Sequence, residues 1–118
     1  MPHSIEEIGI NLLMEQLRKN GHEVKRLRGT FDLDVDGQLA EVKTKTKCFA
    51  EMDFISLTQK QWEAAKIRNF DVYIVCNVNS DTPEIYKVSS QALLKKVPRI
   101  ITSYEYDKNL VKDVAEPL

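Results

Sequence analysis

The chain has 118 residues, of which 42% are hydrophobic and 30% charged, a balance that is typical of a globular domain. These values exclude a disordered chain, a fibrous repeat and a disulfide-stabilised miniprotein, and no apolar run approaches the roughly 20 residues of a membrane span. The net charge of −1 argues against a protein that depends on bulk electrostatic attraction to nucleic acid.

The N-terminus and the cysteines favour an intracellular, cytoplasmic protein with no membrane partner. Met1 to Glu7 lack the basic start and the apolar block of a signal peptide. Cys48 and Cys76 lack the paired spacing of a disulfide framework or a structural zinc site. We interpret them as free thiols in a reducing compartment.

Hydrophobic periodicity and turn residues predict a helix, three strands, a helix, two strands and a short helix, followed by a final strand. Their expected positions in chain order are 5–20, 24–28, 31–35, 39–43, 59–68, 72–76, 85–88, 89–96 and 100–106. The continuous apolar run over 72–76 is typical of a central strand that is buried on both faces. We expect an α/β sandwich with a mixed central sheet in one domain over 1–118, with a core over about 4–106 and a C-terminal tail over about 107–118.

A hairpin centred on Asp36-Gly37 predicts a cluster of charges on one face of the sheet. If these two residues form the turn, Leu33 lies opposite Ala40 and Asp32 lies opposite Glu41. Alternation then predicts two faces, a charged one with Asp32, Asp34, Glu41 and Lys43 and a buried one with Phe31, Leu33, Val35, Ala40 and Val42. A slip of one residue would bury the charges, so the hydrophobic pattern fixes this register.

The predicted cluster has the groups that phosphodiester hydrolysis needs. Two opposed carboxylates are destabilising without a cationic partner, and magnesium prefers such oxygen ligands together with water and phosphate oxygens. Lys43 on the same face could hold the attacking water or stabilise charge on the phosphate. The alternative interpretation is a charged solvent face on which Lys43 only neutralises Glu41.

The motif residues also resemble a known superfamily. Phe31-Asp32-Leu33 followed by Glu41-Val42-Lys43 resembles the PD-(D/E)XK nuclease motif, with Phe31 in place of its proline. The capped first helix and Gly21-His22-Glu23-Val24 look like the start of archaeal Holliday-junction resolvases and Mrr-like restriction enzymes. A longer series over about 4–94 is similar to the nuclease-like domain at the C-terminus of the plant protein NO VEIN and its prokaryotic relatives. That series adds Ser56-Leu57-Thr58, Trp62-Glu63-Ala64-Ala65, Val72-Tyr73-Ile74-Val75 and Ile85-Tyr86-Lys87-Val88.

This resemblance implies a restriction-endonuclease-like three-layer sandwich with a helix-strand-strand-strand-helix-strand core. It implies that Asp32, Glu41 and the Val42 carbonyl hold magnesium or manganese and that Lys43 positions or activates water. Asp34 could replace or assist Asp32. The resemblance also suggests two accessory positions, Glu6 or Glu7 from the first helix and Gln61 from the later one, although capping boxes already explain Glu7 and Gln61.

We therefore expect a metal-dependent DNA endonuclease of the repair, restriction or resolvase type, with RNA also open as a substrate. Four basic residues are candidates for contacts with the nucleic-acid backbone: Arg26, Arg28, Lys45 and Lys47. The protein could act as a homodimer or as a subunit of a larger nuclease complex. The alternative is a catalytically inactive module of the same fold that binds nucleic acid or a protein partner.

Overall fold

The computed structural model describes residues 4–101, 109 and 112–117. Its helices are α1 (Ile5–Lys19), α2 (Gln59–Ile67) and α3 (Ser90–Leu94), and its strands are β1 (Val24–Arg26), β2 (Leu33–Val35), β3 (Gln38–Thr44), β4 (Asp71–Cys76) and β5 (Glu84–Ser89). The strands form one sheet in the order β1-β2-β3-β4-β5, in which β3 and β4 are parallel and the other neighbours are antiparallel. The predicted α/β class, mixed sheet and order of elements up to α3 are confirmed.

The predicted final strand over 100–106 falls mainly on residues that the structure does not describe. Ile100 and Ile101 have no regular secondary structure, and 102–106 lie outside the described residues. The same holds for 107–108, 110–111 and 118 of the expected tail. None of the helices in the described part of the chain is long and apolar enough to cross a membrane.

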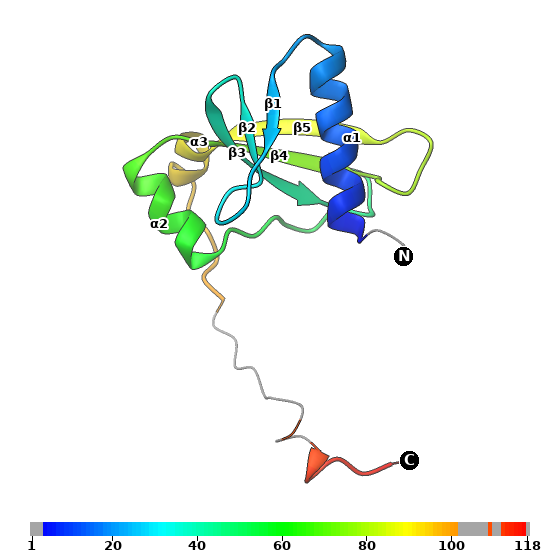
Figure 1. The fold of residues 1–118 in the computed structure, drawn as a ribbon. Helices are drawn as coiled ribbons and strands as arrows, with labels where there is room; N and C mark the ends of the chain where they lie inside the picture. Colours follow the sequence, from blue (N-terminus) through cyan, green and yellow to red (C-terminus); the bar gives the residue numbers. More distant parts are fainter. Residues whose placement is uncertain (1–3, 102–108, 110–111, 118) are drawn as a thin grey trace.

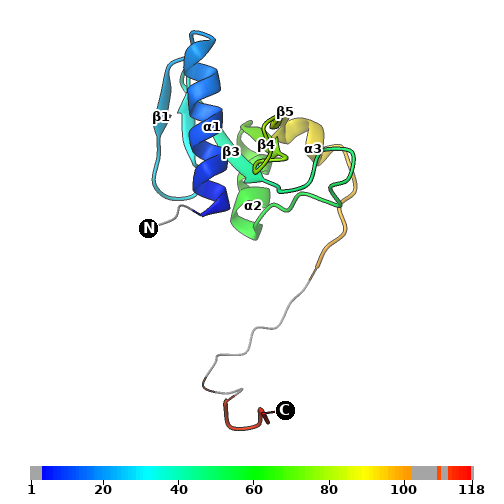
Figure 2. The ribbon, with the colours of Figure 1, turned by 90° about the vertical axis from the view of Figure 1, so that its right-hand side faces the viewer.

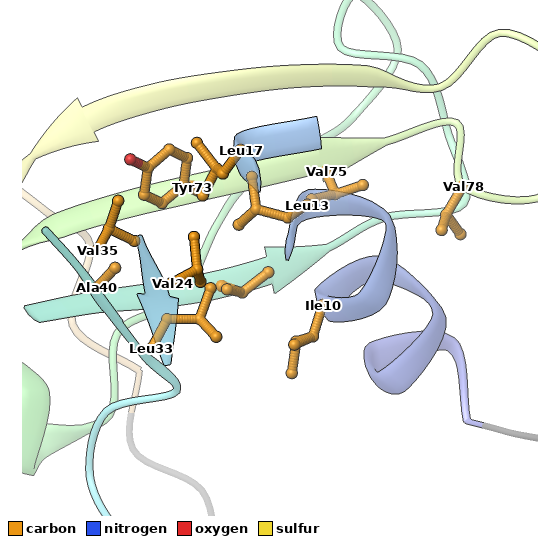
Figure 3. Packing of buried hydrophobic residues seen from close by; sticks show 11 residues of the cluster. Ile10, Leu13, Leu17, Val24, Leu33, Val35, Ala40, Tyr73, Val75 and Val78 are labelled. Carbon is orange, nitrogen blue, oxygen red and sulfur yellow. The ribbon is translucent and has the colours of Figure 1, made fainter. Parts of the chain in front are cut away.

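Helices cover both faces of the sheet, α1 on one face and α2 with α3 on the other (Figures 1 and 2). The α1 side is an apolar cluster in which Ile10, Leu13 and Leu17 pack against strand residues that include Leu33, Val35, Ala40, Val42, Tyr73 and Val75 (Figure 3). The α2 side has a second cluster of Ala65, Phe70, Val72, Ile74 and Cys76. Strand β4 contributes to both clusters, which confirms the prediction of a central strand buried on both faces.

The hairpin between β2 and β3 has the predicted turn and register. Asp36 and Gly37 have φ angles of 52° and 87°, the pair of positive values that a type I′ turn requires. Leu33 lies opposite Ala40 and Val35 opposite Gln38. The Asp36 carboxylate also pairs with His22 Nδ1 at 2.7 Å and accepts the Glu23 N–H at 2.7 Å, so the turn is fastened to the start of β1.

The prediction was wrong for Phe31, which lies on the other face of the sheet. The β2–β3 ladder begins at Leu33, and the Asp32 N–H donates to the Ala40 carbonyl at 3.1 Å. Strict alternation therefore does not extend to Phe31, whose ring packs edge-on against Phe70 in the cluster beneath α2, with centroids 4.9 Å apart. Strand β2 therefore begins at Leu33, two residues later than the apolar pattern indicates.

Helix α1 approaches β3 most closely at Gly9. A Cβ atom at this position would lie 2.6 Å from Thr44 Cγ2 and 2.9 Å from Thr44 Cβ. Only a glycine therefore allows the helix backbone to lie this close to the strand.

We predict that Gly9→Ala destabilises the fold although alanine is the better helix former. The gain in helix propensity is at most about 1 kcal/mol, whereas overpacking costs about 1–3 kcal/mol. Urea unfolding should show a lower free energy of unfolding for Gly9→Ala than for wild type. Adding Thr44→Ala should restore most of the loss relative to Thr44→Ala alone, and a more stable Gly9→Ala single variant would contradict the close packing.

Candidate functional site

Glu41 is a buried carboxylate at the centre of the sheet. It lies in the middle of β3, on the face that α2 covers, and is only 6% exposed. Its Oε2 atom has no hydrogen-bond partner among the described residues. The sequence predicts a charged face here, but it does not predict that Glu41 is buried within that face. An unpartnered carboxylate oxygen inside a protein is costly, so this atom needs an explanation.

Asp32 is held beside Glu41 by contacts from two neighbouring strands. Its Oδ2 accepts the Val42 N–H at 2.9 Å, and its Oδ1 lies 3.5 Å from Arg26 Nη1. Arg26 Nη1 also donates to the Asp32 carbonyl at 3.1 Å. Asp32 thus lies near Glu41 as predicted, but the Val42 N–H fixes its carboxylate rather than a ladder pair with Glu41.

The neighbouring Asp32 carboxylate and burial together perturb Glu41. Burial raises the pKa of Glu41 to about 8, and the nearby Asp32 carboxylate acts in the same direction. The charge of Lys43 and the Val42 N–H oppose the rise without cancelling it. With its pKa raised to about 8, Glu41 retains its proton at neutral pH in the metal-free protein.

Lys43 is positioned by a residue from α2. Its Nζ donates to Gln61 Oε1 at 3.0 Å. The same oxygen accepts the Thr58 N–H at 3.0 Å, and the Gln61 N–H donates to Thr58 Oγ1 at 3.1 Å, which completes the capping box of α2. Gln61 therefore forms the predicted capping box, and its carbonyl oxygen also accepts a hydrogen bond from Lys43, while its accessory role in the site stays a prediction.

The other candidate acids lie elsewhere. Asp34 Oδ1 accepts the Gly37 N–H at 2.8 Å, so this side chain stabilises the hairpin turn. Glu6 and Glu7 are exposed in the first turn of α1, the helix on the opposite face of the sheet from Glu41 and Lys43. The Glu7 N–H donates to Ser4 Oγ at 3.2 Å, in the expected cap.

The four predicted backbone-binding residues fall into two groups. Arg26 contacts Asp32, and Arg28 is exposed in the connection that leads from β1 to Asp32. Lys45 and Lys47 follow β3, where Lys45 Nζ lies 5.0 Å from the centre of the Phe54 ring and Lys47 Nζ lies 3.7 Å from Asp53 Oδ2. The sequence does not reveal that Arg26 contacts Asp32, because no local pattern links these two residues. The spacing of Thr58 and Gln61 does indicate that Thr58 caps α2.

The donor set fits a hard divalent cation that keeps some of its water. Asp32 and Glu41 supply two carboxylates, and no group of three or more His, Cys, Asp or Glu side chains that could hold a metal occurs within 4–101, 109 and 112–117. Magnesium is usually bound by one or two carboxylates together with water and phosphate oxygens. The unpartnered Glu41 Oε2 is the observation that fits such an ion.

We predict that the stability of the metal-free protein declines as pH rises from about 4 to about 8. An unfolded glutamate has a pKa of about 4.3, whereas that of Glu41 in the folded chain is about 8. Between these values the folded protein holds a proton that the unfolded chain has released, so the stabilisation is complete below the lower pKa and is lost toward the upper one. Urea unfolding in chelator should show a decline of the order of a few kcal/mol.

Glu41→Gln is the informative variant for this pH dependence, because glutamine resembles the protonated acid. It should flatten the pH dependence and make the protein more stable than wild type at pH 8.5. Glu63→Gln is the matched control, since Glu63 is exposed and pairs only with Lys66 among the described residues. An equal slope in Glu41→Gln and wild type would contradict a buried proton on this pair.

Comparison with known proteins identifies one family. A search of curated proteins and a search of solved structures each found no significant match. The family model described as "Protein NO VEIN, C-terminal" matches residues 5–88, which include all of α1, β1, β2, β3, α2 and β4. The match also includes Asp32, Glu41, Lys43 and Gln61. The chain therefore belongs to the family of the C-terminal domain of Protein NO VEIN.

Proposed function

We propose that this chain is a metal-dependent endonuclease-like domain that hydrolyses phosphodiester bonds in DNA. The observation that carries this proposal is the pair of buried Glu41 and half-buried Asp32, in which Glu41 Oε2 has no partner in the described part of the chain. Lys43 lies on the same strand as Glu41 and on the same face of the sheet. The helix–sheet–helix layers and the element order are those expected of a restriction-endonuclease-like sandwich, to which we assign the fold.

A purely structural role explains this pair poorly. Burying two carboxylates side by side costs free energy that neither a nearby lysine nor a single proton fully offsets. Apolar residues at both positions would pack beneath α2 without that cost. A bound cation would neutralise both charges and supply the partner that Glu41 Oε2 lacks.

Each residue of the site then has a specific role. Asp32, Glu41 and the Val42 carbonyl would hold magnesium or manganese, an ion that polarises phosphate oxygens and lowers the pKa of bound water. Lys43, held in place by Gln61, orients the attacking water and balances charge that develops on the phosphate. Arg28, Lys45 and Lys47 would contact phosphates along the nucleic-acid strand. The domain would act as a homodimer or within a larger nuclease complex.

We predict that manganese stabilises the wild-type protein and does so more strongly at high pH. The ion competes with the proton that the carboxylate pair retains, so binding should be weak at pH 6 and stronger at pH 8.5. Thermal unfolding with and without manganese should show this difference. Glu41→Gln should abolish it and Glu63→Gln should leave it unchanged. A response in Glu41→Gln equal to that of wild type would place the ion elsewhere.

Cleavage of supercoiled plasmid and of a four-way junction tests the activity itself. Wild type should nick at least one of them with manganese or magnesium and neither in chelator. Lys43→Met and Glu41→Gln should each lower the rate by about 100-fold or more, because each removes a group that acts on developing charge. Lys96→Met and Glu15→Gln are the matched controls, both at exposed positions.

The same assay separates the proposal from its alternative. Cleavage that persists in Lys43→Met and Glu41→Gln would come from a contaminant or from another site. If wild type binds manganese but cuts neither these DNA substrates nor single-stranded RNA, the chain is better described as a binding module with the same fold.

A further inference from the structure

A groove beside the candidate site has features that neither the metal pair nor Lys43 explains. It has a volume of about 760 Å³ and lies between the β1–β2 connection and α2, two segments that come together near the start of the helix (Figure 1). Its lining includes Thr30, Phe31, Lys60, Ala64, Ile67 and Arg68. The groove is open to solvent rather than enclosed, so part of an extended polymer could lie along it.

On each side of the groove, one lining residue is the direct sequence neighbour of a residue of the candidate site. Phe31 directly precedes Asp32, and Lys60 directly precedes Gln61. A nucleic-acid strand with one phosphate at Asp32 and Glu41 would therefore place the adjacent nucleotide in or next to the groove.

The groove combines apolar surface with positive charge. Phe31 and Ala64 are half-buried, and Ile67 is 83% exposed although it is a large apolar residue. Lys60 and Arg68 are exposed, and Arg28 lies two residues before Thr30. The one acid in the lining, Glu63, pairs with Lys66 at 3.7 Å, so the local charge is positive in a chain of net charge −1.

This combination favours an unpaired nucleotide over a continuous duplex. In a duplex the bases are paired and their π-faces are covered by stacking, so an aromatic ring can contact only base edges and the charged backbone. An unpaired base exposes a π-face that stacks on an aromatic ring such as Phe31, while nearby cations bind the adjacent phosphates.

We infer that this groove binds single-stranded DNA next to the scissile phosphate, so that the domain acts on unpaired or branched DNA in preference to intact duplex. The inference rests on the proposed function for the position of the scissile phosphate. The apolar stretch Val97, Ile100 and Ile101 of a second copy is a less suitable occupant, because Arg99 lies within it and would face the cations of the groove.

Fluorescence anisotropy in chelator tests this inference without any cleavage. The probes are a labelled single strand of roughly 16 nucleotides, the same sequence as a blunt duplex, and the same sequence as RNA. Wild type should bind the DNA single strand at least about fivefold more tightly than the duplex. Equal or tighter binding of the duplex, or tighter binding of the RNA strand, would overturn the inference.

Variants then test the apolar surface of the groove. Phe31→Leu should weaken single-strand binding by about fivefold or more and leave duplex binding nearly unchanged, because only an unpaired base stacks. Ile67→Ser should act in the same direction at a highly exposed position, where the fold does not depend on the side chain. Val97→Ser, at a position that is 98% exposed outside the groove, is the control. Groove variants that behave like this control would contradict the inference.

Charge variants test the cations separately. Lys60→Gln and Arg68→Gln should each weaken both complexes and reduce the salt dependence of single-strand binding by about 0.7 in log–log slope, whereas Lys96→Gln should not. Sedimentation of Ile67→Ser adds a further check, since loss of a dimer would identify the groove as a protein interface and overturn the inference.

These readouts do not depend on catalysis. Plasmid nicking without single-strand preference would refute the groove assignment and leave the proposed function in place. Single-strand preference without cleavage would support the groove assignment and count against the proposed nuclease activity.

Discussion

The close approach of two carboxylates, one of them buried, is the constraint on which the candidate site depends. Asp32 lies just before the β2–β3 ladder and next to Glu41 of the adjacent strand, and Glu41 is buried whereas Asp32 is partly exposed. The energetic penalty of this arrangement appears as the raised pKa of Glu41 and as an oxygen without a partner. The sheet would be more stable with apolar residues here, so the acids indicate a requirement other than stability.

The position of the lysine depends on α2. Gln61 accepts the Thr58 N–H, which caps α2, and the same oxygen accepts from Lys43. The start of α2 and the direction of Lys43 are therefore coupled through one atom. A shift of the start of α2 would release Lys43, which makes the local helix cap part of the site's preorganisation.

The two faces of the sheet divide the tasks of the fold. On the α1 side the contacts are apolar, and Gly9 allows the helix to approach β3 closely. On the α2 side the apolar cluster is interrupted by Glu41 and Gln61, which are buried polar residues, and bordered by the groove at Phe31. Both faces therefore have an apolar core, and the buried carboxylate of Glu41 lies on the α2 side.

The sequence by itself determined the order of elements, the turn at Asp36-Gly37 and the register that puts Leu33 opposite Ala40, because these depend on local φ preferences and on period-two alternation. It also identified Asp32, Glu41, Lys43 and Gln61 as candidates. Only the tertiary structure decided that Phe31 changes face, that Arg26 contacts Asp32 and that Glu41 is buried. These features depend on where the ladder ends and on how α2 packs over the sheet, and such long-range contacts leave no periodic trace in the chain.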